Sequence, residues 1–112
     1  MDLKTIQAEL GLQTQCGAER LVAKVTGGYV GDLLSDVMAN SATGQVWITR
    51  QVHQNIVAVA TLKELSGIII VQGAMPDKDT VAKAENEGLP ILSTDLSAFE
   101  VVGRIYRLLA SA

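Results

Sequence analysis

The apolar positions divide the chain into short β-branched runs that are separated by longer segments of mixed character. The clearest run extends from Gly67 to Gly73, where continuous Ile and Val lie between glycines, as in a central strand of a parallel sheet. Other apolar runs predict strands at Leu21–Val25, Gln45–Thr49 and Leu89–Leu92, and a further short strand is expected around Gln13–Cys16.

The segments between these runs have the apolar spacing that is typical of helices. Helices are predicted at Thr5–Gly11, at Leu33–Ala39, at His53–Leu62, from Pro76 to Gly88, and after Ser97. Ser97 and Glu100 have the spacing of a capping box at the start of the last helix. The buried stripe of that helix is predicted to comprise Phe99, Val102, Ile105, Tyr106 and Leu109.

Strands and helices therefore alternate, which favours an α/β fold with right-handed crossovers. We predict one domain over residues 1–112, a three-layer α/β/α architecture with a mostly parallel sheet of four or five strands. Hydrophobic residues make up 48% of the chain and aromatic residues only 4%, so Val, Ile, Leu and Ala must form the core. The helix at His53–Leu62 is apolar on all sides, which indicates a subunit contact and a homodimer.

Charge and cysteine content limit the partners that we expect. The net charge is −3 and the basic residues are scattered, so no nucleic-acid interface is predicted. No apolar run is long enough for a membrane span, and the first residues lead into polar sequence without a signal peptide. With one Cys and one His, neither a disulfide nor a zinc site is expected, and a cytoplasmic location without a cofactor or metal is predicted.

Glycines are concentrated just before the second predicted helix, in the segment Gly27-Gly28-Tyr29-Val30-Gly31-Asp32. Glycine allows a sharp turn and a close approach to a ligand, and a following helix start favours an anion. The spacing matches neither the dinucleotide fingerprint nor the P-loop. The two interpretations are a ligand or interface loop, and a tight turn followed by an Asp32 helix cap.

A second polar segment, Thr49 to Asn55, lies between two apolar elements. If the preceding strand is parallel, this loop is at its carboxyl end, where α/β domains usually bind ligands. Thr49, His53, Gln54 and Asn55 can contact a base, a sugar or a polar metabolite, and they can equally cap the following helix. Gln72-Gly73 and Ser93-Thr94-Asp95 follow the other strands and should lie at the same edge.

Three classes of function remain open on these residues. The first is a non-catalytic regulatory module that senses a small ligand, such as a nucleotide, or mediates homodimerisation and protein assembly. The second is a small hydrolase of phosphate esters or nucleotides that would use His53 with Asp32 or Asp36. The third is a purely structural domain that binds a protein partner.

The segment from Val25 to Met38, together with the Trp-Ile-Thr segment, His-Gln-Asn-Ile-Val-Ala-Val-Ala and Gly-Ile-Ile-Ile, resembles the DRTGG domain family. The naming motif falls on Lys24-Val25-Thr26-Gly27-Gly28, where Thr-Gly-Gly is kept and Lys24 and Val25 stand in place of Asp and Arg. Such domains are similar in fold to the N-terminal domain of HPr kinase/phosphorylase and occur in CBS-pair regulatory proteins. The resemblance implies a non-catalytic regulatory or dimerising module and provides no catalytic residue.

The predicted contact surface therefore consists of two loops, at residues 26–32 and 49–55. We expect them to meet at one edge of the sheet and to bind a ligand or a second subunit. The candidate residues are Thr26, Gly27, Gly28, Tyr29, Gly31, Asp32, Thr49, His53, Gln54 and Asn55.

Overall fold

A single five-stranded sheet organises the molecule, with the strands in the order β1-β5-β4-β3-β2. The computed structural model describes all 112 residues. The strands are β1 (Gln13–Cys16), β2 (Gly27–Val30), β3 (Gln45–Thr49), β4 (Gly67–Ile70) and β5 (Ile91–Ser93). Strands β2 to β5 are parallel, and β1 is antiparallel to β5 at one edge. The predicted α/β class and mostly parallel sheet are confirmed.

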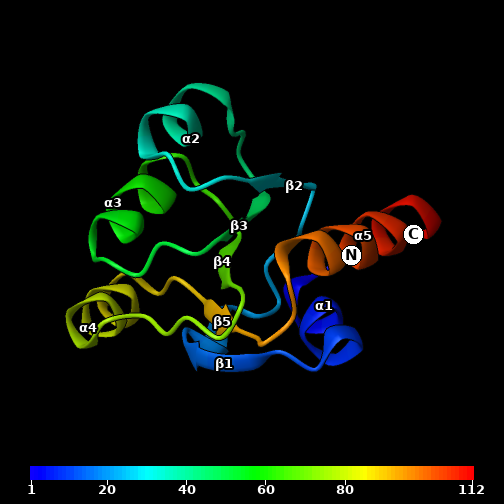
Figure 1. Ribbon diagram of the computed structural model, residues 1–112, viewed down its shortest axis with the longest axis horizontal. Helices are drawn as coiled ribbons and strands as arrows, with labels where there is room; N and C mark the ends of the chain where they lie inside the picture. Colours follow the sequence, from blue (N-terminus) through cyan, green and yellow to red (C-terminus); the bar gives the residue numbers. More distant parts are fainter.

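Five α-helices cover the two faces of the sheet (Figure 1). They are α1 (Leu3–Leu10), α2 (Leu34–Asn40), α3 (Asn55–Leu62), α4 (Lys78–Glu87) and α5 (Ala98–Ser111). Helices α2, α3 and α4 lie on one face, and α1 and α5 lie on the other face together with both chain termini. None of the helices has the length and apolar character needed to cross a membrane.

Each face of the sheet has its own hydrophobic core. Toward α1 and α5, strand residues such as Ile48 and Ile69 pack against Ile6 and Ile105. Toward α2, α3 and α4, Trp47 and other strand residues form the second core. Because successive residues of β3 point to opposite faces, all of Val46, Trp47 and Ile48 are buried.

The helix ends follow the local sequence. Gly11 and Gly88 end α1 and α4 in the left-handed conformation, with φ of 65° and 68°. Ser97 caps α5, since its side chain accepts a hydrogen bond of 3.2 Å from the Glu100 N–H.

One predicted strand is misplaced. The strand expected at Leu21–Val25 is absent except for one bridge between Asp2 and Lys24, and Gly27–Val30 forms β2 instead. The glycine pair is therefore inside an edge strand and not in a turn, with Gly27 opposite Gln45 and Gly28 opposite Val46. Pairing with β3 outweighs the low strand propensity of glycine here.

The prediction for α5 was wrong at two positions. Val101 and Ile105 form its buried side, whereas the Phe99 side chain is 91% exposed and Tyr106 is 75% exposed. Helix α3 also differs from the prediction, because Ala58 and Leu62 face outward while Ile56 and Val57 are buried. An apolar helix surface is thus left uncovered on both faces of the sheet.

Candidate functional site

Asp32 joins the loops that follow β2 and β3. Its Oδ1 accepts hydrogen bonds from the Thr49 hydroxyl at 2.7 Å and from the Arg50 N–H at 2.8 Å. Gln51 Nε2 donates to the Asp32 carbonyl oxygen at 2.7 Å. The predicted cap role of Asp32 is wrong, since Leu33 is the N-cap residue of α2 and makes no side-chain cap. The parallel pairing of β2 and β3 places the carboxyl ends of both strands side by side. The polar groups of Asp32 are therefore hydrogen-bonded to the loop after β3 and do not cap α2.

Further contacts fix the end of β2. Trp47 Nε1 donates to the Gly31 carbonyl oxygen at 2.8 Å, across the two strands. The Tyr29 hydroxyl donates to the carboxylate of Asp36, and this hydrogen bond raises the pKa of Tyr29 above its usual value. Asn40 Nδ2 donates to the other oxygen of Asp36 at 2.8 Å. The polar groups of β2, α2 and β3 around this strand end thus bind one another.

His53 has a different carboxylate partner from the one that the hydrolase hypothesis requires. Its Nδ1 lies 3.2 Å from Asp77 Oδ2, at the start of α4, and the imidazole is 72% exposed. Asp32 and Asp36 bind the hydroxyls of Thr49 and Tyr29. The pairing of His53 with Asp32 or Asp36 is therefore not formed, since the loop after β3 extends His53 toward α4 and away from β2.

The ten candidate residues fall into three places. Thr26 and Gly27 lie at the amino end of β2, where the Thr26 hydroxyl donates to the Thr43 carbonyl oxygen at 3.1 Å. Gly28 and Tyr29 are inside the strand, and the others lie at or beyond the carboxyl ends of β2 and β3. The residues at those ends are Gly31, Asp32, Thr49, His53, Gln54 and Asn55.

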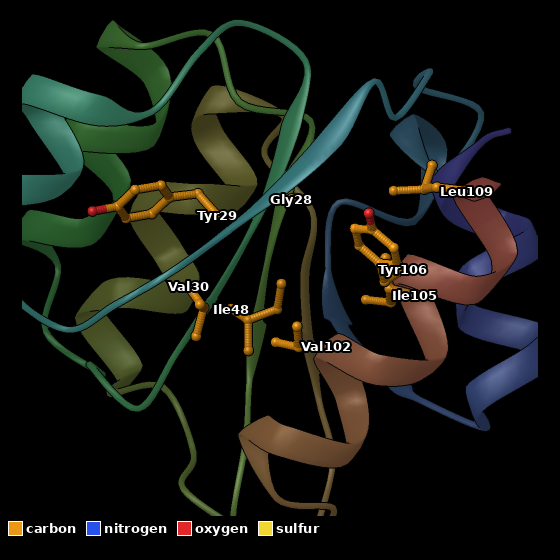
Figure 2. Close-up of a pocket in the computed structure, with 8 residues that line it drawn as sticks. All are labelled: Gly28, Tyr29, Val30, Ile48, Val102, Ile105, Tyr106 and Leu109. Atoms are coloured by element: carbon orange, nitrogen blue, oxygen red, sulfur yellow. The ribbon is translucent and has the colours of Figure 1, made fainter.

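Between β2 and α5 lies an uncovered apolar face, which we define by Gly28, Val30, Phe99, Val102 and Tyr106. A hollow of about 80 Å³ separates strand from helix, and a wider one of about 430 Å³ lies over Val30 and the start of α5. Figure 2 shows Val30 and Ile48 opposite the side chains of α5, whereas Tyr29 points to the other face of the sheet.

The sequence reasoning missed Val30, Phe99 and Tyr106 as surface residues. A helical projection of α5 provides the missing signal, since Val101, Ile105 and Leu108 centre its buried side. Phe99 and Tyr106 project well away from that side, at about 150° and about 130° from its centre at 100° per residue. A single helix packed against one sheet cannot bury apolar side chains over so wide an arc of its circumference.

The arrangement of side chains supports neither a reactive thiol nor a metal site. Burial raises the pKa of the Cys16 thiol to about 11, so that it is protonated near neutral pH. The chain contains no group of three or more His, Cys, Asp or Glu side chains arranged to hold a metal ion.

The fold, its polar loops and its uncovered face define a small three-layer α/β module. The model of the DRTGG domain matches residues 5–108, and the chain belongs to the DRTGG domain family, as the resemblance in sequence implied. The motif that names the family corresponds here to the approach to β2 and its first two residues.

A solved structure has the same fold. The CBS and DRTGG domains of the regulatory region of Clostridium perfringens pyrophosphatase, complexed with the activator diadenosine tetraphosphate, are similar with a TM-score of 0.71 and 20% identity. The match covers 89% of this chain and 44% of that chain, so this chain spans less than half of the matched structure. No curated protein matches the chain.

We expect the Asp32 contacts to stabilise the fold measurably. Replacing Asp32 with Ala leaves the Thr49 hydroxyl, in a residue only 2% exposed, without its acceptor. The free energy of unfolding should fall by about 1–3 kcal/mol, measured by urea denaturation. Glu9→Ala, on the exposed side of α1, is the control and should change it by less than about 0.5 kcal/mol. An equal effect of both substitutions would contradict the assigned role of Asp32.

Proposed function

We propose that this chain is a non-catalytic regulatory module that works as a homodimer, with the apolar face as the contact between the two copies. The observation that carries the proposal is the exposure of two aromatic side chains, Phe99 at 91% and Tyr106 at 75%, on one side of α5. Large exposed aromatic residues beside an apolar hollow are typical of protein contact surfaces.

The edge of the sheet supports a second copy as the occupant. Strand β2 pairs only with β3, so its outer edge has backbone groups that are free to pair with another strand. Two copies of β2 can pair in antiparallel orientation about a two-fold axis, because a two-fold contact uses the same surface of both subunits. Since α5 lies beside β2, the same axis brings the two α5 helices together.

The glycines of β2 fit this arrangement. Neither Gly27 nor Gly28 has a positive φ, and a Cβ atom added at either would meet neighbours at ordinary distances of 3.7 Å or more. The chain itself thus gives no steric reason for glycine at these positions. A strand of glycines permits the close approach of another backbone from outside.

Charges beside the apolar face also agree with two antiparallel α5 helices. Glu100 lies in the first turn of α5, where it pairs with Arg104 of the same helix, and Arg107 lies two turns later on the same flank. An antiparallel arrangement places Glu100 of one copy near Arg107 of the other. Opposite charges in these positions favour this orientation over a parallel one.

Small-ligand sensing is the second candidate function. It is favoured by the structure of the Clostridium perfringens regulatory region, which was obtained with an activator, diadenosine tetraphosphate. In this chain the exposed side chains of Gln54 and Asn55, after β3, remain available to a ligand or a protein partner, whereas His53 is exposed but its Nδ1 lies against Asp77. The loop at 26–32 contributes Gly31 and Asp32 to the same edge of the sheet.

The proposed interface predicts that Phe99→Glu and Tyr106→Glu each weaken self-association at least about 100-fold, because each substitution places two carboxylates in the contact. Sedimentation velocity over a range of micromolar concentrations measures the effect. Both side chains are exposed in the single chain, so the circular dichroism spectrum of the variants should remain unchanged, and Tm should fall only by the stabilisation that association itself supplies.

Two matched substitutions serve as controls. Val22→Glu changes an apolar side chain that is 71% exposed in the loop before β2, and Leu62→Glu changes one that is 70% exposed on α3. Both variants should associate as the wild type does. Loss of association in Leu62→Glu alone would place the contact on α3 and contradict the proposed interface.

A further inference from the structure

The carboxyl ends of β4 and β5 form a crevice that neither loop of the predicted site includes. After β4 the chain continues to α4 on one face of the sheet, and after β5 it continues to α5 on the other face (Figure 1). Where neighbouring parallel strands send their connections to opposite faces, the loops separate and leave a crevice for a ligand. In this fold that divergence occurs between β4 and β5.

A polar hollow of about 290 Å³ occupies this place. Its lining comes from three parts of the chain: the loop after β4, the loop after β5, and the turn into β1. The residues that matter for its chemistry are Gln13, Met75, Ser93, Thr94 and Asp95.

Hydrogen bonds between the two loops fix the base of the hollow. The Gln72 N–H donates to the Leu96 carbonyl oxygen at 2.9 Å, and the Gly73 N–H donates to the Thr94 carbonyl oxygen at 3.0 Å. Gln72 and Gly73 both adopt the left-handed conformation, with φ of 59° and 74°. A non-glycine residue held in this conformation costs about 1 kcal/mol or more, so the crevice has a preformed shape that the surrounding bonds maintain.

Asp95 gives the hollow its chemical character. Its carboxylate takes part in neither of the two ion pairs of the chain, and no Lys or Arg lines the hollow. Its Oδ1 lies so near Gly73 that an added Cβ would be only 3.3 Å away, which shows that the carboxylate lies over the loop after β4. The site therefore offers hydrogen-bond acceptors and no positive charge, which disfavours phosphate.

We propose that this crevice binds the vicinal diol of a neutral sugar or nucleoside, with Asp95 accepting hydrogen bonds from the two hydroxyls. A carboxylate has two oxygens with which to accept them, and Gln13 and Thr94 supply an amide and a hydroxyl beside it. The half-exposed Met75 side chain provides an adaptable apolar contact for the rest of the ligand. The proposal deepens the ligand-sensing role and is independent of dimerisation.

Amide NMR spectra of the isotope-labelled full chain test the site, with adenosine and methyl β-ribofuranoside as probes. Saturable shifts are expected at the amides of Gly73, Ala74, Thr94 and Asp95. Binding of both probes identifies the sugar as sufficient, and binding of adenosine alone identifies a nucleoside. Dideoxyadenosine, which lacks the diol, should bind at least about tenfold more weakly.

Asp95→Asn should weaken binding by at least about tenfold, whereas Asp77→Asn, at another exposed carboxylate of the same edge, should leave it unchanged. The absence of saturable shifts at millimolar concentrations of both probes would overturn the proposal. So would equal binding of adenosine and dideoxyadenosine, or of the wild type and Asp95→Asn. Because the mass of the particle is measured separately, failure here is distinguishable from failure of the proposed dimer.

Discussion

Replacing Trp47 with Ala should lower the free energy of unfolding by about 3–5 kcal/mol, the range for removal of a large aromatic side chain from a core. Trp47 is 0% exposed and lies in the middle of β3, among the residues that pack against α2 and α3. Its Nε1 also holds the Gly31 carbonyl oxygen at 2.8 Å. Because domains of this size have about 5–15 kcal/mol of stability, such a loss removes a large part of it.

Urea denaturation followed by far-UV circular dichroism measures the change, since the variant has no tryptophan fluorescence. Trp47→Phe separates the contribution of core packing from that of the hydrogen bond, because it keeps an aromatic ring and removes the N–H donor. Its loss should be smaller, about 1–3 kcal/mol. A Trp47→Ala variant as stable as the wild type would show that β3 is not the packed centre of the sheet.

Replacing Gly17 with Ala should also be strongly destabilising, by about 2–5 kcal/mol. Gly17 has a φ of 75°, and a Cβ atom there would lie 2.5 Å from the Pro90 Cα, so that the backbone before β5 would have to move. The cost combines the left-handed conformation, about 1–2 kcal/mol, with the overpacking of rigid backbone, about 1–3 kcal/mol.

Gly11→Ala is a matched control for this substitution. Gly11 has a φ of 65°, but an added Cβ would meet nothing within 4 Å. Only the cost of the left-handed conformation remains, so the free energy of unfolding should fall by about 1 kcal/mol. Thermal unfolding of the two variants side by side gives the comparison, and equal values of Tm would show that Gly17 and Pro90 do not approach closely.

The interior of the sheet could be predicted from sequence because burial on both faces leaves a clear pattern. The run around Ile69 and the segment Gln45–Thr49 are continuously apolar, and both became central strands. The helix ends at Gly11 and Gly88 also followed local rules, since a left-handed residue is needed there.

The edge strand β2, unlike the other edge strand β1, could not be predicted in this way. Gly27 and Gly28 have little strand propensity of their own, and only pairing with β3 makes them a strand. Asp32 has a common capping residue type at a plausible position, yet its partner Thr49 is far away in sequence. Local patterns do not reveal contacts of this kind, which depend on the register between two strands.

The buried residues of α5 also could not be predicted from local sequence alone. The spacing of its apolar residues correctly predicts an amphipathic helix, but Phe99 and Tyr106 have nothing to pack against within one chain. A sequence indicates that an apolar residue favours burial and not whether its own fold or another molecule covers it. The wide arc of apolar residues on α5 is the feature that the proposed dimer explains.

The mass of the wild-type particle in solution tests the central proposal most directly. The chain has a mass of 11.9 kDa, and sedimentation equilibrium at micromolar concentrations should give twice that value. Phe99→Glu measured beside it should give the single-chain mass. A wild-type mass of 11.9 kDa across the whole concentration range would contradict the account, because the apolar face would then have no second copy to cover it.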